Sequence, residues 1–458
     1  MIKTTDAEKR KIDIIIYFII AIFFAIVFLC FDYRESDFFV VLTFYMIGIF
    51  SFYKIVTARK NITLQRVFYI FMFIFMFFAP LQQYLSGTIL WKSNGLVLKY
   101  TDDDYLKANS LLLLFIATFE LGYKVHLKKK KSDNFVSSFS VKSSSASLFF
   151  LQIISVCCVL ILFVTGNISG REGIEVAEGS AQLMNILRFF LVACFIITIC
   201  QKEKGKKYLN FSLILYIIEI FIVFFPFNGS ISRYLLFGVY LGIISLFFSH
   251  SKTKSLYFLL FIVGFFFVFS AFNFFKTNGL DDIKDFSLAL VDFNKGDYDA
   301  YQLLMVTMRY VKEMGVSYGS NLLTVVFCFI PRSIWAGKSE ITGGIVIGYY
   351  GSWYTNVSCP WFAECFFAFG WFGVTLGGFF TGLLFKKIDS FDYTLDYFKR
   401  GVFCISSGLL IYILRGSLLP TFSFTLSLII ALLLVVIINR IFNSNKINTE
   451  NSLLKYYS

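Results

Sequence analysis

The sequence predicts an all-α polytopic integral membrane protein with about 12 transmembrane helices and one long external loop carrying interfacial helices. Three observations support this fold class. Of the 458 residues, 57% are hydrophobic and 16% are charged, whereas about a quarter of the residues in soluble domains are charged. The apolar residues form long runs without the alternation of strands, which excludes a membrane barrel. Lys and Arg residues gather in alternate loops between these runs.

Twelve apolar runs have the length of membrane helices, since about 20 apolar residues span the hydrocarbon layer of about 30 Å. The expected helices cover residues 12–31, 37–56, 64–84, 106–123, 147–166, 183–200, 208–226, 232–249, 256–274, 361–385, 400–416 and 421–441. The hydrocarbon layer holds no water, so backbone groups there must be satisfied within the helices. We therefore expect residues 1–458 to form a single transmembrane domain.

The basic residues predict the orientation of the chain. Every short loop on one side is positive, and the basic loop 124–146 contains four consecutive lysines. Because positive loops stay in the cytoplasm, we expect both termini and loop 124–146 on the cytoplasmic side. The formal net charge of +13 is then explained by loops that face anionic lipids, and we expect no nucleic-acid binding.

Residues 275–360 are expected to form the long external loop between the ninth and tenth helices. The loop mixes charged, aromatic and glycine residues, and its apolar run 321–330 is too short to span a bilayer. We expect this run to lie in the interface or to dip into it; a true crossing with a partner elsewhere is the alternative. The acidic cluster 292–299 lacks the spacing of a calcium loop and is expected to be solvated surface.

Histidine and cysteine are poorly placed for chemistry on the external side. The two histidines, His126 and His250, fall in loops expected to be cytoplasmic, and the nine cysteines follow no metal or disulfide spacing. We therefore expect no metal site and no cofactor. All five prolines fall in the outer half or the outer loops on this topology. Because proline interrupts helices, this distribution favours a functional outer side.

Charged residues on the expected external side are the candidate functional groups. The arginines among them are Arg171, Arg233, Arg309, Arg332 and Arg415. A guanidinium group presents a planar fork of donors that suits phosphate oxygens, so converging arginines predict binding of a lipid-linked diphosphate. Snorkelling to the interface is the alternative for each arginine. Glu364 is expected just inside the bilayer, where a carboxylate is costly; it would pair with an arginine or accept a proton.

Three stretches of the chain resemble the Wzy-type oligosaccharide repeat-unit polymerases. One is Phe329-Ile-Pro-Arg-Ser-Ile-Trp-Ala-Gly-Lys338, followed by a Gly-rich segment and by Glu364 with Phe369-Gly370 and Gly373. The others are Gly229-Ser-Ile-Ser-Arg233, which opens an expected helix, and Leu414-Arg-Gly-Ser417. The resemblance covers roughly residues 225–420, whereas the first 200 residues match only in helix count and hydropathy.

The resemblance implies a metal-independent glycosyltransferase at the outer face of the bacterial cytoplasmic (inner) membrane. Such polymerases transfer a growing glycan from undecaprenyl diphosphate to the sugar of a new lipid-linked repeat unit, in O-antigen or capsule biosynthesis. They release undecaprenyl diphosphate and need no nucleotide sugar. The implied partners are the undecaprenyl-diphosphate-linked oligosaccharide, membrane lipids, and a chain-length regulator and flippase of the same pathway.

The resemblance also implies roles for individual residues. Arg233, Arg332 and Arg415 would hold the diphosphate and stabilise its charge as the anomeric C–O bond breaks. Glu364 would deprotonate or orient the acceptor hydroxyl, or position an arginine. The expected substrate-binding residues are Lys338, Trp335, Arg309, Arg171, Tyr350 and Trp353. The aromatic ones, together with Tyr349 and Tyr354, would line a sugar groove; an interfacial aromatic belt is the alternative.

Three other functions stay open. The related O-antigen ligases rely on a histidine at the outer face, which is missing here. A flippase for lipid-linked oligosaccharides should carry charges along central helices and show two similar halves, whereas here the charges gather outside and no repeat is evident. A non-catalytic scaffold for polysaccharide assembly is the third alternative.

Overall fold

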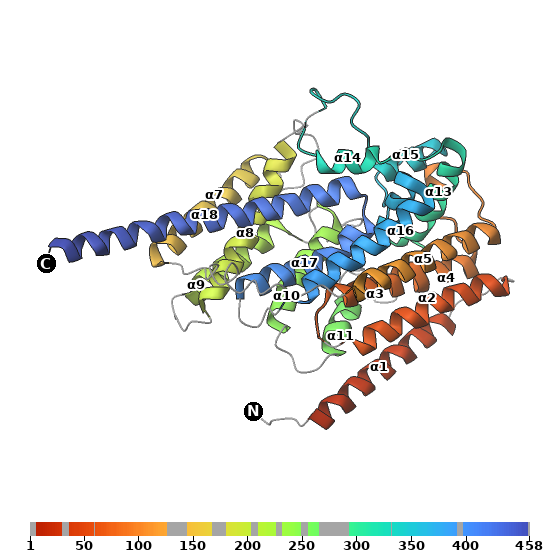
Figure 1. The fold of residues 1–458 in the computed structure, drawn as a ribbon, viewed down its shortest axis with the longest axis horizontal. Coiled ribbons are helices and arrows are strands. Elements are labelled where there is room, and N and C mark those ends of the chain that lie inside the picture. The colour runs from red at the N-terminus through yellow and green to blue at the C-terminus, as the bar shows by residue number, and fades with distance from the viewer. Residues whose placement is uncertain are drawn as a thin grey trace, which may run out of the picture.

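The structure is a computed structural model of the 458-residue chain, drawn as a ribbon in Figure 1. It describes residues 6–29, 36–58, 60–125, 144–166, 180–202, 209–225, 231–248, 255–264, 293–330, 332–391 and 397–456. Within these ranges every regular element is a helix, so the described part of the chain has an all-α fold.

Most of the long helices overlap the runs expected from the sequence. Those before the long loop are α1 (Asp6–Leu29), α2 (Phe38–Thr57), α3 (Leu64–Phe71), η1 (Met72–Phe78), α4 (Ala79–Ser86), η2 (Lys92–Asn94), α5 (Asp102–Lys124), α7 (Ser145–Val164), α8 (Ser180–Lys202), α9 (Leu209–Val223), α10 (Arg233–Phe248) and α11 (Ser255–Val263). Those that follow are η6 (Gly296–Tyr298), α13 (Ala300–Met314), α14 (Ser320–Val326), α15 (Thr342–Tyr349), α16 (Trp361–Asp389), α17 (Tyr397–Arg415) and α18 (Leu418–Tyr456). Each of the twelve expected segments overlaps one of these helices or the continuous run from α3 to α4.

Seven helices in the described ranges are long and apolar enough to cross a membrane. They are α2, the continuous run Leu64–Ser86, α5, α7, α8, α16 and α18. Two shorter apolar stretches, Phe211–Val223 and Arg233–Leu246, lie in α9 and α10. The length and apolar composition of these helices indicate that the chain is a membrane protein. The twelve crossings and the cytoplasmic termini stay predictions.

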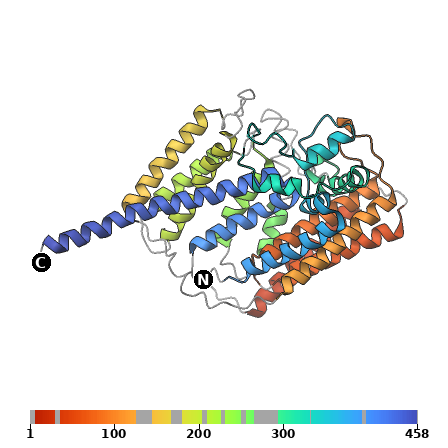
Figure 2. The same ribbon diagram turned by 45° about the horizontal axis from the view of Figure 1, so that its top comes forward.

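Two groups of helices make up the bundle (Figures 1 and 2). The helices α1, α2, α3 and α5 lie side by side in one group, and α7, α8 and α9 lie in the other. The pair of α10 and α17 connects the groups, because α17 contacts both α3 and α8. The helix α18 packs on α8 and then extends beyond the body of the bundle.

Glycines allow α5 and α16 to cross at close range. A Cβ atom at Gly382 would overlap the carbonyl oxygen of Phe119, and one at Gly122 would overlap the carbonyl oxygen of Phe379. Small residues let helix backbones approach in this way, and membrane helices associate largely through such packing. The contact fixes α16, which carries Glu364, against the first group of helices.

The helix α16 differs from the single helix expected over residues 361–385. Its backbone leaves the helical region at Phe369 (φ −144°, ψ 21°) and at Gly370 (φ 59°, ψ −143°). The conformation of Gly370 is open to glycine and strained for any residue with a Cβ atom. The helix therefore consists of two arms, residues 361–368 and 371–389, joined by a sharp turn.

Contacts between the two arms of α16 show that they run antiparallel. In a straight helix Trp361 and Thr381 would lie about 30 Å apart, since each residue adds about 1.5 Å. Instead, Trp361 Nε1 donates a hydrogen bond to Thr381 Oγ1 at 3.0 Å. A Cβ atom at Gly373 would likewise overlap the carbonyl oxygen of Cys365. The second arm alone, about 28 Å long, has the length of a membrane span.

A buried polar network joins four helices at the end of the bundle that is opposite to the turn of α16. Glu120 accepts hydrogen bonds from Lys54 Nζ at 2.5 Å, from Tyr69 OH at 2.6 Å and from Gln65 Nε2 at 3.1 Å. Asp389 accepts hydrogen bonds from two backbone N–H groups in the first turn of α3 and so caps this helix. The network holds α2, α3, α5 and α16 in register.

The long loop contains the helices α13, α14 and α15, which lie at the end of the bundle away from this network (Figure 1). The apolar run 321–330 begins in α14 and ends in turns, and the seven residues of α14 are too few to cross a bilayer. Residues 275–292 of the loop, and most of loop 124–146, lie outside the described residues. The interfacial position of α14 stays a prediction.

The reversal of α16 predicts whether one substitution, Gly370→Ala, raises or lowers the stability of the protein. Gly370→Ala should lower the melting temperature of the protein in detergent, because alanine in this conformation is strained by about 1–3 kcal/mol. In a continuous helix the same change would stabilise by about 1 kcal/mol, since alanine has the higher helix propensity. Gly348→Ala in α15 is the control, because its Cβ would meet its nearest neighbour at 3.9 Å. A higher melting temperature for Gly370→Ala would contradict the reversal.

Candidate functional site

The crossing of α10 and α17 brings two of the predicted arginines together. A Cβ atom at Gly408 of α17 would overlap the carbonyl oxygen of Gly238 in α10. Gly242, one turn further along α10, packs against an earlier turn of α17, so the two helices are antiparallel. Arg233, the first residue of α10, therefore lies at the same end as Arg415, the last residue of α17.

Arg415 is bound on several sides by residues 296–299. Its Nη2 donates hydrogen bonds to Asp299 Oδ1 at 2.7 Å and to the carbonyl oxygen of Gly296 at 3.1 Å. Its Nε donates to the carbonyl oxygen of Asp297 at 3.2 Å. The guanidinium carbon lies 4.1 Å from the centroid of the Tyr234 ring, which adds a cation–π contact. Arg415 therefore cross-links the end of α17 to the long loop.

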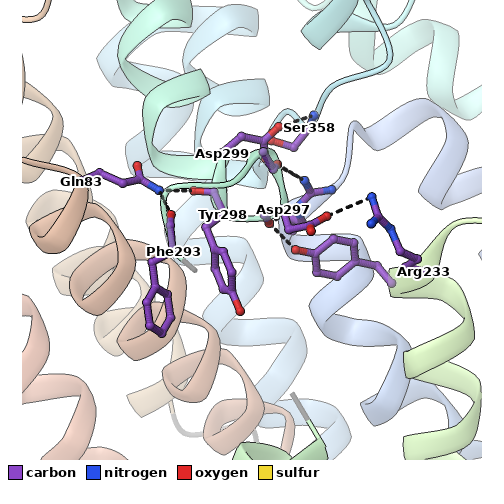
Figure 3. Close-up of polar contacts among 10 residues, drawn as sticks. Gln83, Arg233, Phe293, Asp297, Tyr298, Asp299 and Ser358 are labelled. Carbon is purple, nitrogen blue, oxygen red and sulfur yellow. Dashed lines mark hydrogen bonds and ion pairs between the residues drawn. The ribbon is translucent and has the colours of Figure 1, made fainter. Parts of the chain in front are cut away.

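Asp299 is the fully buried partner of Arg415. Its side chain is 0% exposed, and its Oδ2 accepts a hydrogen bond from the backbone N–H of Ser358 at 3.3 Å (Figure 3). Burial raises the pKa of the Asp299 carboxyl, and the positive charge of Arg415 acts against this rise. Removing either partner leaves a buried charge without compensation, which disfavours any arrangement that separates the pair.

Arg233 is held less tightly than Arg415. Its Nη2 lies 3.1 Å from Asp297 Oδ1, and its side chain is 26% exposed (Figure 3). The neighbouring Tyr234 donates its hydroxyl hydrogen to the carbonyl oxygen of Asp297. We call Arg233, Tyr234, Asp297, Asp299 and Arg415 the arginine cluster. Within the cluster, Arg233 is the more exposed arginine, at 26% against 14% for Arg415.

Two glutamines hold the segment 293–299 from the side opposite the arginines. Gln83 Nε2, from α4, donates hydrogen bonds to the carbonyl oxygens of Phe293 at 2.7 Å and Tyr298 at 3.1 Å (Figure 3). Gln302 Nε2, from α13, donates to Gln83 Oε1 at 3.0 Å. The segment is thus fixed between α4 and the pair of α10 and α17, so the acidic side of the cluster is preformed.

Glu364 lies on the first arm of α16 and is 1% exposed. Its carboxylate accepts hydrogen bonds from Thr342 Oγ1 at 2.7 Å, from Asn321 Nδ2 at 2.9 Å and from the backbone N–H of Leu418 at 2.9 Å. Leu418 is the first residue of α18, so the carboxylate caps this helix three residues after Arg415. The geometry suits a positioning role, and the role of general base stays a prediction.

Two other expected residues bind carbonyl groups of their own loop. Arg332 donates hydrogen bonds to the carbonyl oxygens of Lys338 at 2.9 Å and Ser339 at 3.3 Å. Lys338 Nζ donates to the carbonyl oxygens of Cys328 at 2.8 Å and Ile330 at 2.9 Å. These contacts stabilise the turns of residues 328–339, where the neighbouring Trp335 is half-exposed.

The remaining expected substrate-binding residues differ in how accessible they are. Arg309 pairs with Asp104 at 2.9 Å and is partly buried. Tyr350 is half-buried, whereas Trp353 is 72% exposed. Arg171 lies outside the described residues. The structure thus brings Arg233 and Arg415 together and leaves Trp353 open to a ligand.

The expectation that the acidic cluster 292–299 is solvated was wrong for Asp297 and Asp299. Both side chains are buried, and they neutralise Arg233 and Arg415, which were expected to hold the diphosphate. A signal was present in the sequence. Arginines that gather near an apolar bundle need acidic partners, and the motif Asp-Tyr-Asp combines two such partners with an aromatic residue suited to burial.

No protein-family model, no curated protein and no solved structure matches this chain. The candidate site therefore rests on its own geometry and on the sequence motifs. Among the residues that the structure describes, no group of three or more His, Cys, Asp or Glu side chains is placed to hold a metal ion.

The two arginines should differ in their contribution to stability. Arg415→Met leaves Asp299 buried without its opposing charge and should destabilise the protein by about 3–5 kcal/mol. Arg233→Met also removes a charge partner of the buried Asp297, but the 26% exposed Arg233 position lies close to solvent, so the variant should cost less, about 1–3 kcal/mol. Thermal unfolding of both variants in detergent measures the difference. Equal losses of stability would contradict this division of roles.

Proposed function

We propose that the chain is a metal-independent glycosyltransferase that polymerises undecaprenyl-diphosphate-linked oligosaccharide repeat units. The observation that supports this function best is the convergence of Arg233 and Arg415, far apart in the sequence, at one end of an apolar helical bundle. Guanidinium groups bind phosphate oxygens through paired hydrogen bonds, and a lipid-linked diphosphate would approach from the bilayer. Both arginines also belong to the motifs that resemble the Wzy-type polymerases.

In this mechanism Arg233 acts on the leaving group. A hydroxyl group of the new repeat unit attacks the anomeric carbon of the growing glycan, and a glycosidic C–O bond forms. The C–O bond to the diphosphate breaks, its electron pair leaves with undecaprenyl diphosphate, and the hydroxyl proton is released to water. Positive charge already fixed where negative charge develops lowers the barrier without reorganisation.

The two arginines have different roles in this proposal. Arg233 contacts the diphosphate, because it is partly exposed and a phosphate oxygen can replace its single carboxylate partner, Asp297. Arg415 is committed to the buried Asp299 and positions the site. Glu364 holds the start of α18 just after Arg415 and so acts as a second positioning residue.

The proposal includes a setting for the reaction. The site would face the outside of a bacterial cytoplasmic membrane, with both termini and loop 124–146 in the cytoplasm. Arg309, Arg332 and Lys338 would add positive charge for the lipid diphosphate beside the long loop. A chain-length regulator and a flippase of the same pathway would be partners, and the product would be O-antigen or capsular polysaccharide.

The reversed arm of α16 favours one alternative, a flippase for lipid-linked oligosaccharides. Transporters bind their substrates where membrane helices are interrupted, and η1 adds a seven-residue π-helix to the run Leu64–Ser86. The functions differ in what accumulates after deletion of the gene. Loss of a polymerase leaves single repeat units on the outer acceptor, loss of a flippase leaves units inside, and loss of a ligase leaves polymer on the lipid carrier.

Arg233→Ala should abolish polymer while the protein stays in the membrane, because the variant keeps the fold but loses its contact with the diphosphate. A gel of surface glycan from a deletion strain carrying the variant should show single repeat units in place of a ladder. Arg440→Ala, which changes an exposed arginine of α18, is the matched control and should restore the ladder. A normal ladder with Arg233→Ala would refute the mechanism, and a normal ladder in the deletion strain would refute the function.

A further inference from the structure

A row of aromatic rings connects the arginine cluster to the surface. Gly296, whose carbonyl oxygen binds Arg415, packs so closely on the Trp91 ring that a Cβ would lie 2.5 Å from its Cη2 atom. The Trp91 ring stacks on Tyr354, with centroids 5.3 Å apart and an interplanar angle of 23°. Tyr354 in turn meets Trp353 edge to face at 6.1 Å, and Trp353 is 72% exposed.

We propose that Trp91, Tyr354 and Trp353, which we call the aromatic shelf, form a saccharide-binding site. A pyranose ring of the glycan stacks on Trp353, and Trp91 is the positioning residue that joins the shelf to the arginine cluster. The inference rests on the proposed function and deepens it, because it assigns the sugar part of the substrate to named rings. Trp91 lies between α4 and α5 and was not among the residues expected from the sequence.

Backbone contacts fix the shelf before any ligand binds. Trp91 has φ 62°, a left-handed conformation that is uncommon for residues other than glycine. Its carbonyl oxygen accepts hydrogen bonds from the N–H groups of Asn94 at 2.9 Å and Leu96 at 3.2 Å. The N–H of Trp353 donates to the carbonyl oxygen of Asn94 at 3.1 Å, so the two aromatic segments are tied together. Such strained conformations gather at ligand sites, and a pre-oriented ring loses little freedom on binding.

The chemistry of the shelf suits a sugar. The face of an aromatic ring carries partial negative charge, and the axial C–H groups of a pyranose carry partial positive charge, so the two faces attract while the hydroxyl groups stay hydrated. The exposed Trp353 ring offers such a face at the outer end of the row. The inner end of the row lies at the arginine cluster. A glycan stacked on Trp353 would therefore keep its diphosphate end near Arg233.

An aromatic belt at the membrane interface is the competing use of an exposed tryptophan. The exposed residues next to the shelf in the sequence include the polar Lys92, Ser93, Thr355 and Asn356, whereas the exposed apolar residues Val97 and Tyr349 lie further away along the chain. Belt residues border the hydrocarbon layer and have apolar neighbours on one side. The polar surroundings of the shelf therefore favour a hydrated ligand such as a glycan.

Saturation-transfer-difference NMR tests the shelf directly. The sample is the full-length protein in lipid nanodiscs, and the probe is a repeat-unit oligosaccharide obtained by partial acid hydrolysis of the surface glycan of the wild-type strain. Irradiation of the aromatic protons of the protein should transfer saturation to C–H protons of the sugar. Trp353→Ala should weaken binding of the probe at least tenfold. Trp371→Phe, which changes another exposed tryptophan, is the matched control and should bind normally.

The proposal of the aromatic shelf would be overturned if the wild type transferred no saturation to the sugar, or if Trp353→Ala and the wild type bound the probe equally well. The glycan ladder of the deletion strain tests the proposed polymerase function separately. If the deletion strain loses the ladder but Trp353→Ala binds the probe as the wild type does, the shelf alone is overturned. If the deletion strain keeps a normal ladder but Trp353→Ala binds the probe weakly, the polymerase alone is overturned.

Discussion

The ion pair between Arg415 and Asp299 is the interaction on which the arrangement of the site depends. It joins the last residue of α17 to the residue before α13, and so joins the helical bundle to the long loop. A buried pair adds little net stability over an apolar contact, but it strongly disfavours arrangements that leave one charge alone. The pair therefore fixes the segment 293–299, and through Gly296 it fixes the aromatic shelf relative to Arg233.

The rest of the bundle acts as a support for this polar end. Glycine contacts between α10 and α17, centred on Gly238 and Gly408, hold the two helices together. Arg233 and Arg415 therefore lie at the same end of this helix pair. The network around Glu120 fixes the opposite end of the neighbouring helices. The reversed arm of α16 then carries Glu364 to the start of α18, where it caps the helix that follows Arg415. Among the described residues, Arg415, Asp297, Asp299 and Glu364 are thus oriented before a ligand arrives.

The positions of the helices could be predicted because long apolar runs leave a membrane protein few alternatives. The reversal of α16 could not, since both arms are apolar and only the backbone of Gly370 marks the turn. Arg233 and Arg415 could be selected as residue types suited to phosphate. The motif Asp-Tyr-Asp signals buried acidic partners, but which arginine pairs with which aspartate could not be predicted, because it depends on contacts between segments far apart in the sequence. Trp91 was not predicted as a site residue for the same reason, since it lies beside Gly296 only in the folded chain.

A double-mutant cycle on Arg415 and Asp299 measures the central interaction most directly. Thermal unfolding in detergent would compare the wild type, Arg415→Met, Asp299→Asn and the double variant. Each single change leaves one buried polar group without its partner, so the double variant should lose less stability than the two losses added together. The expected coupling is about 0.5–3 kcal/mol. Losses that simply add would show that the pair does not hold the site together.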